Sequence, residues 1–458
     1  MDAFAERLGR VGAWCSGNKY LNGVKNAFQN YMPATIAGAV GILWCNVLVN
    51  ATTGLGKLWS PIMALEFLNP IFSALQYATI SCITIGITML LAQEIAEANG
   101  EQGAYPAVLG FILWLCVTPT SFDPLTQAVT LANGKSALLS QFVSLPKGAT
   151  VASFTGIASS YTSATGLFTG MVIAILGMEI YNLFRKMDAI KIRMPEQVPQ
   201  GVARAFEVLV PTLFTAIVVG AMGLICYQAT GGYLNELVYN AVQKPLTTII
   251  GNNIIACMIL YIIIMLFWLI GIHGVNMVAG VRDPIFKPLL YANVAAFAAG
   301  KSNAQIPYAI NLTMLESFGQ VTGSGVTIGL IAAIFLFGKR EDNRTIAMIS
   351  IAPGIFNINE TVTFGIPLVL NPILGIPFVI TPAICIFVGW LLITVGFCPK
   401  FVLEVPWTTP PLIQAFIATG GNIMGAITQA IILLLSILIY SPFFIAYEKY
   451  QNKQSQNI

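Results

Sequence analysis

The sequence predicts an all-α integral membrane protein with about ten transmembrane helices and two re-entrant hairpins. Three observations support this fold class. Of the 458 residues, 56% are hydrophobic and only 9% are charged, whereas a soluble domain carries about 25% charged residues. Apolar runs long enough to cross lipid recur along the chain. Basic residues gather in a few of the loops between these runs, as they do on the cytoplasmic side of membrane proteins.

Nine apolar runs are long enough to be candidate spans. They cover residues 34–53, 71–92, 105–121, 164–183, 205–227, 255–272, 320–338, 366–397 and 426–447. Fourteen of the 22 basic residues lie before the first run, after the fourth, after the seventh or in the C-terminal tail. Because basic loops face the cytoplasm, both termini are predicted to be cytoplasmic.

The spacing of two basic loops indicates a further crossing that hydropathy does not reveal. Residues 185–204 and 339–344 are both basic, so an even number of crossings must separate them. Only three apolar runs lie between, and the missing crossing is expected within 273–318. Polar backbone at membrane depth is tolerated only where protein buries it or a watery cavity touches it. In transporters, such interrupted segments form the binding site.

A second interrupted segment is expected near 345–366. Asn357, Asn359 and Glu360 lie there, just before a stretch dense in proline and glycine. That composition predicts a re-entrant hairpin. The two asparagines could bind a polyol or cap the hairpin, and their residue type favours neither role.

His273 and Glu360 are the candidates for chemistry. His273 is the only histidine in the chain, and imidazole can both donate to and accept from hydroxyl groups near neutral pH. The alternative is a helix-end histidine bonded to a carbonyl. Inserting the carboxylate of Glu360 at membrane depth costs at least ~2.5 kcal/mol of free energy. This cost favours a functional role, in which the carboxylate accepts a hydrogen bond from a hydroxyl group. Its alternative is an ion pair with Arg282 or Lys287.

Trp407 could stack on a sugar ring, or it could belong to the aromatic belt at the membrane interface. The belt is the preferred interpretation for the tryptophans at positions 44, 59, 114, 268 and 390. Gly323, Gly325 and Gly329 form a loose glycine pattern that is interpreted as helix packing.

Several function classes lack support in the sequence. No Walker motif is present, and no two of the eight cysteines are spaced as CxxC. No basic stripe with interleaved aromatic residues suggests nucleic acid. We expect no metal and no cofactor in this chain, and we interpret the cysteines as small core residues.

Two blocks, GIHGVNMV at 271–278 and FNINETVTFGIPLVLNPILGIPF at 356–378, resemble a known permease family. The family is the lactose/cellobiose/diacetylchitobiose group of phosphotransferase system IIC components. The segments KIRMPEQVPQGVARAF (191–206), GSGVTIGLIAAIF (323–335) and VPWTTPP (405–411) resemble further landmarks of that group. One departure is Thr361, where the family often has proline. The resemblance runs from about residue 20 to 447, which is nearly the whole chain.

The resemblance implies a dimeric permease of the bacterial inner membrane that moves a β-linked disaccharide inward. A phosphorylated IIB protein, supplied by IIA, HPr and enzyme I, would then phosphorylate the sugar, so the chain would be the membrane subunit of a sugar phosphotransferase. It further implies that His273 and Glu360 bind the sugar around the reacting hydroxyl and that Trp407 stacks on a ring. The full expected set of sugar-binding residues is His273, Gly274, Asn276, Asn357, Asn359, Glu360 and Trp407, with Glu360 and His273 as catalytic residues.

Five segments follow from the span pattern together with the resemblance. They are an amphipathic cytoplasmic segment (1–33), an oligomerisation half (34–190), a cytoplasmic linker (191–204), a sugar-binding half (205–447) and a tail (448–458). Because the interrupted segments all lie in the second half, a homodimer is expected to use residues 1–190. Two other functions remain open: a proton- or sodium-coupled secondary sugar transporter, and a membrane enzyme acting on a lipid-linked sugar.

The topology can be tested by labelling single cysteines introduced at Lys191 and Lys339 in sealed membranes. Both positions are expected to react only with reagents that reach the cytoplasmic side, because both lie in basic loops. Labelling of either position from the periplasmic side would contradict the topology.

Overall fold

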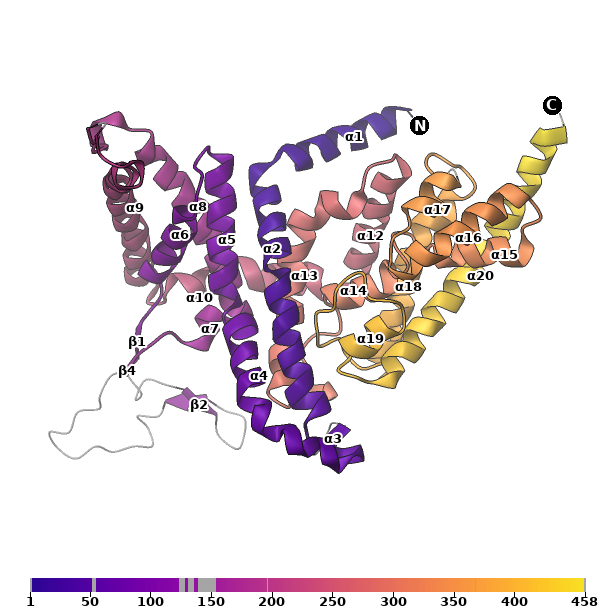
Figure 1. Ribbon diagram of the computed structural model, residues 1–458, viewed down its shortest axis with the longest axis horizontal. Coiled ribbons are helices and arrows are strands. Elements are labelled where there is room, and N and C mark those ends of the chain that lie inside the picture. The colour runs from indigo at the N-terminus through magenta and orange to yellow at the C-terminus, as the bar shows by residue number, and fades with distance from the viewer. Residues whose placement is uncertain are drawn as a thin grey trace. The chain divides into compact units, whose positions relative to one another are not determined.

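The computed structural model describes residues 2–51, 55–122, 128–130, 136–138, 154–195, 197–366 and 368–456. Nearly all regular structure in these ranges is helical (Figure 1). The exceptions are two small antiparallel pairs, in which β1 (Ser121–Phe122) pairs with β4 (Phe154–Thr155) and β2 (Ala128–Thr130) with β3 (Ser136–Leu138). The all-α membrane fold class is therefore confirmed.

Each of the nine predicted apolar runs contains helix in its described part. By length and apolarity, five helices in the described part of the chain could cross a membrane, or up to seven if two bent pairs each count as one span. The predicted hidden crossing at 273–318 contains a continuous helix, α13 (Gly274–Ala298). Its 25 residues are long enough to span a bilayer, although it carries three buried charged side chains. The figure of about ten crossings stays a prediction.

The chain forms two compact units, residues 1–81 with 242–458 and residues 82–241. The units do not coincide with the two predicted halves, because residues 34–81 group with the C-terminal part of the chain. The roles expected for the two halves therefore stay predictions.

The unit formed by residues 82–241 is a helix bundle. Its helices are α5 (Ile83–Ala98), α6 (Tyr105–Cys116), α7 (Ser159–Thr162), α8 (Leu167–Arg185), α9 (Gln200–Thr230) and α10 (Leu234–Val238), with η6 (Ala164–Gly166) and η7 (Asp188–Ile190). Small residues let its backbones approach, since a Cβ on Gly110 would collide with Ala92 and one on Gly170 with Thr88. The buried carboxylate of Glu101 joins Arg185 and Arg204, each at 2.7 Å, and so ties α8 and α9 to the loop before α6.

The larger unit contains the remaining helices. Its first part holds α1 (Asp2–Gly17), α2 (Lys19–Leu43), η1 (Trp44–Leu48), α3 (Leu55–Leu58), η2 (Ser60–Leu68), α4 (Asn69–Gln76) and η3 (Tyr77–Ser81). The boundary between the units in the sequence falls within η8 (Tyr239–Gln243), and the second part begins with α11 (Lys244–Leu246), η9 (Thr247–Gly251) and α12 (Ile254–Leu269). After α13 follow η10 (Asn303–Gln305), α14 (Leu312–Gly319), α15 (Ile328–Phe337), α16 (Glu341–Ile355), α17 (Glu360–Gly365), α18 (Gly375–Thr394), α19 (Ile413–Ala418) and α20 (Ile423–Gln456).

Helix α13 packs against α2 on one side and α12 on the other (Figure 1). The second interrupted segment is a hairpin of two helices, α16 and α17, which contact each other across the turn at 356–359. A continuous apolar core built from α12, α14, α15, α18 and α20 supports both segments. The irregular backbone at 321–327, between α14 and α15, is buried by protein, as membrane depth requires.

The apolar run 320–338 was predicted as one span, and this is wrong for its first part. Residues 320–327 form an irregular loop, and only Ile328–Phe337 is helical. Gly323 and Gly325 have φ of +92° and +87° and sit in this loop, so they do not serve helix packing. Gly329 does, because a Cβ there would meet the backbone of Ser436 in α20 at 2.6 Å. The loop places backbone and small side chains where a straight helix would have continued.

Candidate functional site

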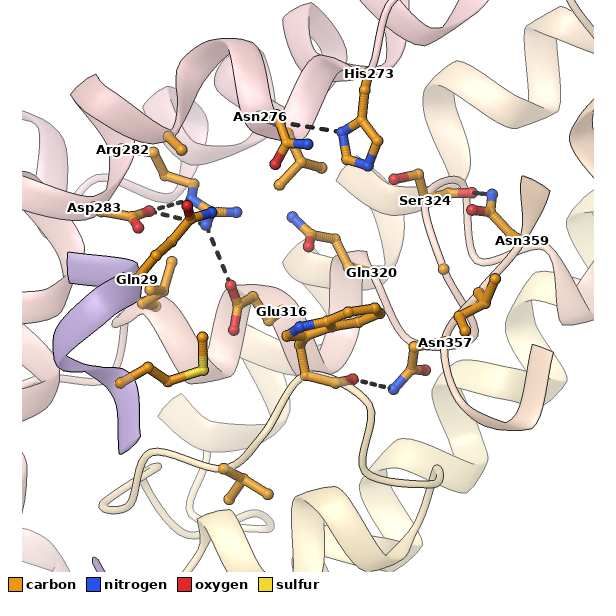
Figure 2. Close-up of a pocket in the computed structure, with 18 of the residues that line it drawn as sticks. Gln29, His273, Asn276, Arg282, Asp283, Glu316, Gln320, Ser324, Asn357 and Asn359 are labelled. Atoms are coloured by element: carbon orange, nitrogen blue, oxygen red, sulfur yellow. Dashed lines mark hydrogen bonds and ion pairs between the residues drawn. The ribbon is translucent and has the colours of Figure 1, made fainter. Parts of the chain in front are cut away.

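A cavity of about 310 Å³ lies within the larger unit (Figure 2). Its lining comes from α2, α12, α13, α14 and α19, from the irregular segments at 320–324 and 357–359 with the first residue of α17, and from the loop at 404–407. Of the seven residues predicted to bind substrate, six line it: His273, Asn276, Asn357, Asn359, Glu360 and Trp407. Gly274 does not, because it is buried where α13 begins, against the backbone of Ile264 in α12.

His273 is the N-cap of α13, and its position fixes which nitrogen is available. Nδ1 accepts a hydrogen bond from the backbone N–H of Asn276 at 3.3 Å (Figure 2). In the neutral imidazole the other nitrogen, Nε2, then carries the hydrogen. The ring packs on Trp268 with centroids 4.5 Å apart. His273 therefore offers the cavity a hydrogen-bond donor. The alternative considered was a histidine bonded to a backbone carbonyl, but the ring accepts from a backbone N–H instead.

Asn357 holds three loops together. Its Oδ1 accepts from the backbone N–H of Thr322 at 2.5 Å, and its Nδ2 donates to the carbonyls of Trp407 at 2.5 Å and Thr409 at 3.0 Å. Its own φ is +63°, a left-handed conformation that asparagine tolerates better than most residues. Both amide hydrogens are used, so the side chain organises the cavity wall and has only acceptor capacity left for a ligand.

Asn359 and Glu360 occupy the start of α17. Asn359 donates to the carbonyl of Ser324 at 2.6 Å and to the hydroxyl of Thr363 at 3.1 Å, so it also ties the hairpin to the loop at 320–327. Glu360 is the first residue of α17 and lines the cavity. No ion pair involving its carboxylate is found in the described part of the chain. The ion pair with Arg282 or Lys287 that was considered as its alternative does not form, since both cations pair with other carboxylates.

Trp407 is half exposed and lines the cavity, with its backbone carbonyl held by Asn357. Trp268, which was assigned to the interfacial belt, is 3% exposed and also lines the cavity. That assignment is wrong for Trp268, as it is for Trp114, which is 1% exposed in the other unit. Burial of a tryptophan depends on packing between helices, and the local sequence does not record it.

Five charged residues line the cavity and were not among the predicted site residues: Arg282, Asp283, Lys287, Glu316 and Glu404. The first three are buried, and the two glutamates are partly buried. Arg282 pairs with Asp283 at 2.9 Å and with Glu316 at 3.3 Å. Lys287 pairs with Glu404 at 3.3 Å, and Tyr291 donates to the same carboxylate at 2.9 Å. Three of the five stand close together on α13, and that spacing was the signal available in the sequence. Glu316 and Glu404 come from distant segments.

The arrangement suits a neutral, hydroxyl-rich ligand. The cavity combines the indole of Trp407 with side chains of histidine, glutamine, asparagine and glutamate, and binding sites commonly join an apolar or aromatic wall to a few convergent polar groups. The charged side chains largely neutralise one another. Among the described residues no group of histidine, cysteine and acidic side chains could hold a metal ion.

Comparison with known proteins gives a consistent result. Residues 25–382 match the family model described as phosphotransferase system, EIIC. The chain is 28% identical over 459 residues to the lichenan permease IIC component of Bacillus subtilis (strain 168), covering 99% of this chain and 94% of that protein. It is 32% identical over 332 residues to the cellobiose-specific EIIC component of Geobacillus stearothermophilus, covering 72% and 73%.

A solved structure is similar over almost the whole chain. It is the crystal structure of the transporter ChbC, the IIC component from the N,N'-diacetylchitobiose-specific phosphotransferase system. The TM-score is 0.84 at 28% identity, and the match covers 98% of each chain.

The role of Asn357 can be tested with Asn357→Gly, which accepts a positive φ but removes the three hydrogen bonds. We expect ligand affinity to fall by about tenfold, because the loop at 322 and the backbone of Trp407 lose their shared tether, and stability to drop by on the order of 1–2 kcal/mol. Ligand binding and thermal melting of the purified protein measure both effects. Asn253→Gly, at the N-cap of α12 and outside the cavity, is the matched control and should leave affinity unchanged. Unchanged affinity in Asn357→Gly would contradict the tethering role.

Proposed function

The chain belongs to the EIIC family of the phosphotransferase system, and from that membership we propose that it carries a β-linked disaccharide of the cellobiose, diacetylchitobiose or lactose type into the cell. The observation that carries this proposal is the cavity that joins Trp407 to His273 and Glu360. An indole face packs on the apolar face of a pyranose ring, and the polar groups bind its hydroxyls. The relatives include permeases named for lichenan, oligo-β-mannoside and cellobiose.

The proposed reaction transfers a phosphoryl group from a cysteine of a separate IIB protein to a sugar hydroxyl. The sugar oxygen forms a bond to phosphorus, the bond from sulfur to phosphorus breaks, and the thiolate stays on IIB. Such transfer depends mainly on positioning and on stabilising the charge that develops. In this chain Glu360 would accept the hydroxyl proton, and the Nε2–H of His273 would orient the same oxygen.

Assembly and orientation are part of the proposal. The chain would act in the bacterial inner membrane as a homodimer with both termini in the cytoplasm, where IIB, fed by IIA, HPr and enzyme I, can reach the sugar. The mass of the purified protein in detergent tests the dimer. Among the curated relatives are lactose-specific EIICB components, and the chain spans about half of their length.

A secondary transporter coupled to protons or sodium is the competing function, and Glu360 would be its coupling group. Sugar uptake into vesicles separates the two. The permease should deliver phosphorylated sugar and require phosphorylated IIB. Accumulation of unmodified sugar driven by an ion gradient would refute the permease function.

Stacking on Trp407 is tested with Trp407→Ala. Loss of one aromatic contact of about 1 kcal/mol should weaken sugar binding by roughly fivefold without unfolding the protein. Calorimetry or tryptophan fluorescence of the purified protein gives the affinity. Trp407→Phe should restore most of it, and Trp59→Ala, which removes a similarly exposed indole outside the cavity, should have no effect. Equal affinity of wild type and Trp407→Ala would place this residue in the interfacial belt.

The role of Glu360 as general base is tested with Glu360→Gln, which keeps the shape of the side chain and one acceptor oxygen. Sugar binding should remain measurable, while the rate of phosphorylation at saturating phosphorylated IIB should fall by about 10²–10⁴-fold. His273→Ala should weaken both binding and phosphorylation. Glu97→Gln, an exposed substitution on α5, is the control. A near-normal rate in Glu360→Gln would limit this residue to binding.

A further inference from the structure

The guanidinium of Arg282 is fixed on two of its three nitrogens and free on the third. Its Nε and Nη2 both lie 2.9 Å from Oδ1 of Asp283, and Nη2 lies 3.3 Å from Oε1 of Glu316 (Figure 2). Carboxylates thus occupy one edge of the planar group. Because the guanidinium is rigid, these two partners also set the direction of the remaining nitrogen, Nη1.

Nη1 of Arg282 is buried and has no hydrogen-bond partner among the described residues. The residue is 4% exposed and lines the cavity. A buried donor without a partner costs about 1–3 kcal/mol, and more when the group is charged. Native proteins rarely leave such a donor unsatisfied unless a ligand or water fills the position. The cavity beside Arg282 is where such a partner would be bound.

A second donor in the cavity has the same property. Nε1 of Trp268 is buried without a partner in the described part of the chain, and its ring packs on His273. Arg282 lies nine positions beyond His273, which corresponds to about 13 Å along the axis of α13. The backbone that carries Arg282 is therefore well separated from His273, on which the ring of Trp268 packs. One sugar ring at His273 could reach Nε1 of Trp268 and would leave Nη1 of Arg282 without a partner.

The charges around Arg282 restrict the chemistry of its ligand. Two buried cations, Arg282 and Lys287, pair with three carboxylates, those of the buried Asp283 and the partly buried Glu316 and Glu404. This set has no excess positive charge, so an anionic group would not be favoured there. A donor in such surroundings suits a neutral oxygen acceptor, such as a sugar hydroxyl or an acetamido carbonyl.

We propose that Arg282 is a sugar-binding residue whose Nη1 donates to a neutral oxygen of the ring that is not phosphorylated, and that this contact makes the cavity prefer a disaccharide over a monosaccharide. The inference rests on the proposed function, because it takes His273 and Glu360 as the site of the reacting ring. Asp283 and Glu316 are positioning residues in this arrangement, since they orient the guanidinium and leave Nη1 for the sugar.

Arg282→Lys tests the proposal with the least disturbance of the fold. Lysine keeps the positive charge that Asp283 and Glu316 require, but it has no second nitrogen to present to the sugar. Affinities are measured for two pairs of ligands, cellobiose with methyl β-glucoside and diacetylchitobiose with N-acetylglucosamine. Thermal melting and gel filtration establish that the variant is folded. Arg204→Lys, an ion-paired arginine outside the cavity, is the matched control.

We expect the variant to lose about tenfold in disaccharide affinity, as for a hydrogen bond to a charged donor worth about 1.4 kcal/mol. The affinity for the one-ring sugars should change by less than about twofold. A loss confined to diacetylchitobiose identifies an acetamido oxygen as the acceptor, and a loss with cellobiose identifies a hydroxyl. Trp268→Phe removes the donor beside His273 and should weaken one-ring and two-ring sugars alike.

Two results would overturn the inference. Equal losses for one-ring and two-ring sugars in Arg282→Lys would mean that this residue only supports the fold, and unchanged affinities would mean that Nη1 does not contact the sugar. Failure of the wild-type protein to bind either pair is a different result, because it would refute the permease function itself.

Discussion

Burying charge inside a helical membrane protein is costly unless each charge has a partner, and the larger unit is organised around that requirement. Helix α13 carries Arg282, Asp283 and Lys287 into the interior. Their pairing with Glu316 and Glu404 draws α14 and the loop before Trp407 against α13. A buried pair that lost one member would leave an uncompensated charge. The ion pairs that stabilise the charged side chains of α13 in the protein interior therefore also form one side of the cavity.

Irregular backbone obeys the same rule through hydrogen bonds. The loop at 320–327 and the turn at 356–359 leave backbone groups without helical partners, and non-glycine residues with positive φ occur in both, at Thr322, Val326 and Asn357. The amides of Asn357 and Asn359 satisfy several of these groups across the two segments. A binding cavity needs backbone that departs from regular helix. The asparagine side chains stabilise this irregular backbone by supplying the hydrogen bonds that its buried groups would otherwise lack.

The sequence was sufficient for the fold class and placed six of its seven predicted site residues in the cavity, but it did not reveal the charged side of the cavity. Parity of basic loops predicted a crossing where α13 lies, although hydropathy missed it, and proline and glycine density predicted a hairpin where α16 and α17 lie. Whether either segment crosses or re-enters the membrane stays a prediction. Six predicted residues from three distant segments line one cavity. The pairing of Arg282 with Glu316 and of Lys287 with Glu404 escaped prediction because partners 34 and 117 positions apart leave no local pattern. The burial of Trp268 likewise depends on how α12 meets α13.

The two sides of the cavity differ in how completely their polar groups are paired, and this difference bears on the proposed reaction. Around Arg282 and Lys287 every carboxylate has a cation within 3.3 Å. The charges on that side are therefore already paired in the absence of a ligand. At the other side Glu360 forms no ion pair with the described residues, and Nε2 of His273 remains available because Nδ1 is used by the backbone. A carboxylate locked to an arginine would be a poor proton acceptor, since its charge is already stabilised. In the proposed function, pairing one set of charges tightly while leaving Glu360 unpaired would let a single cavity hold a sugar by one ring and keep a base available beside the other.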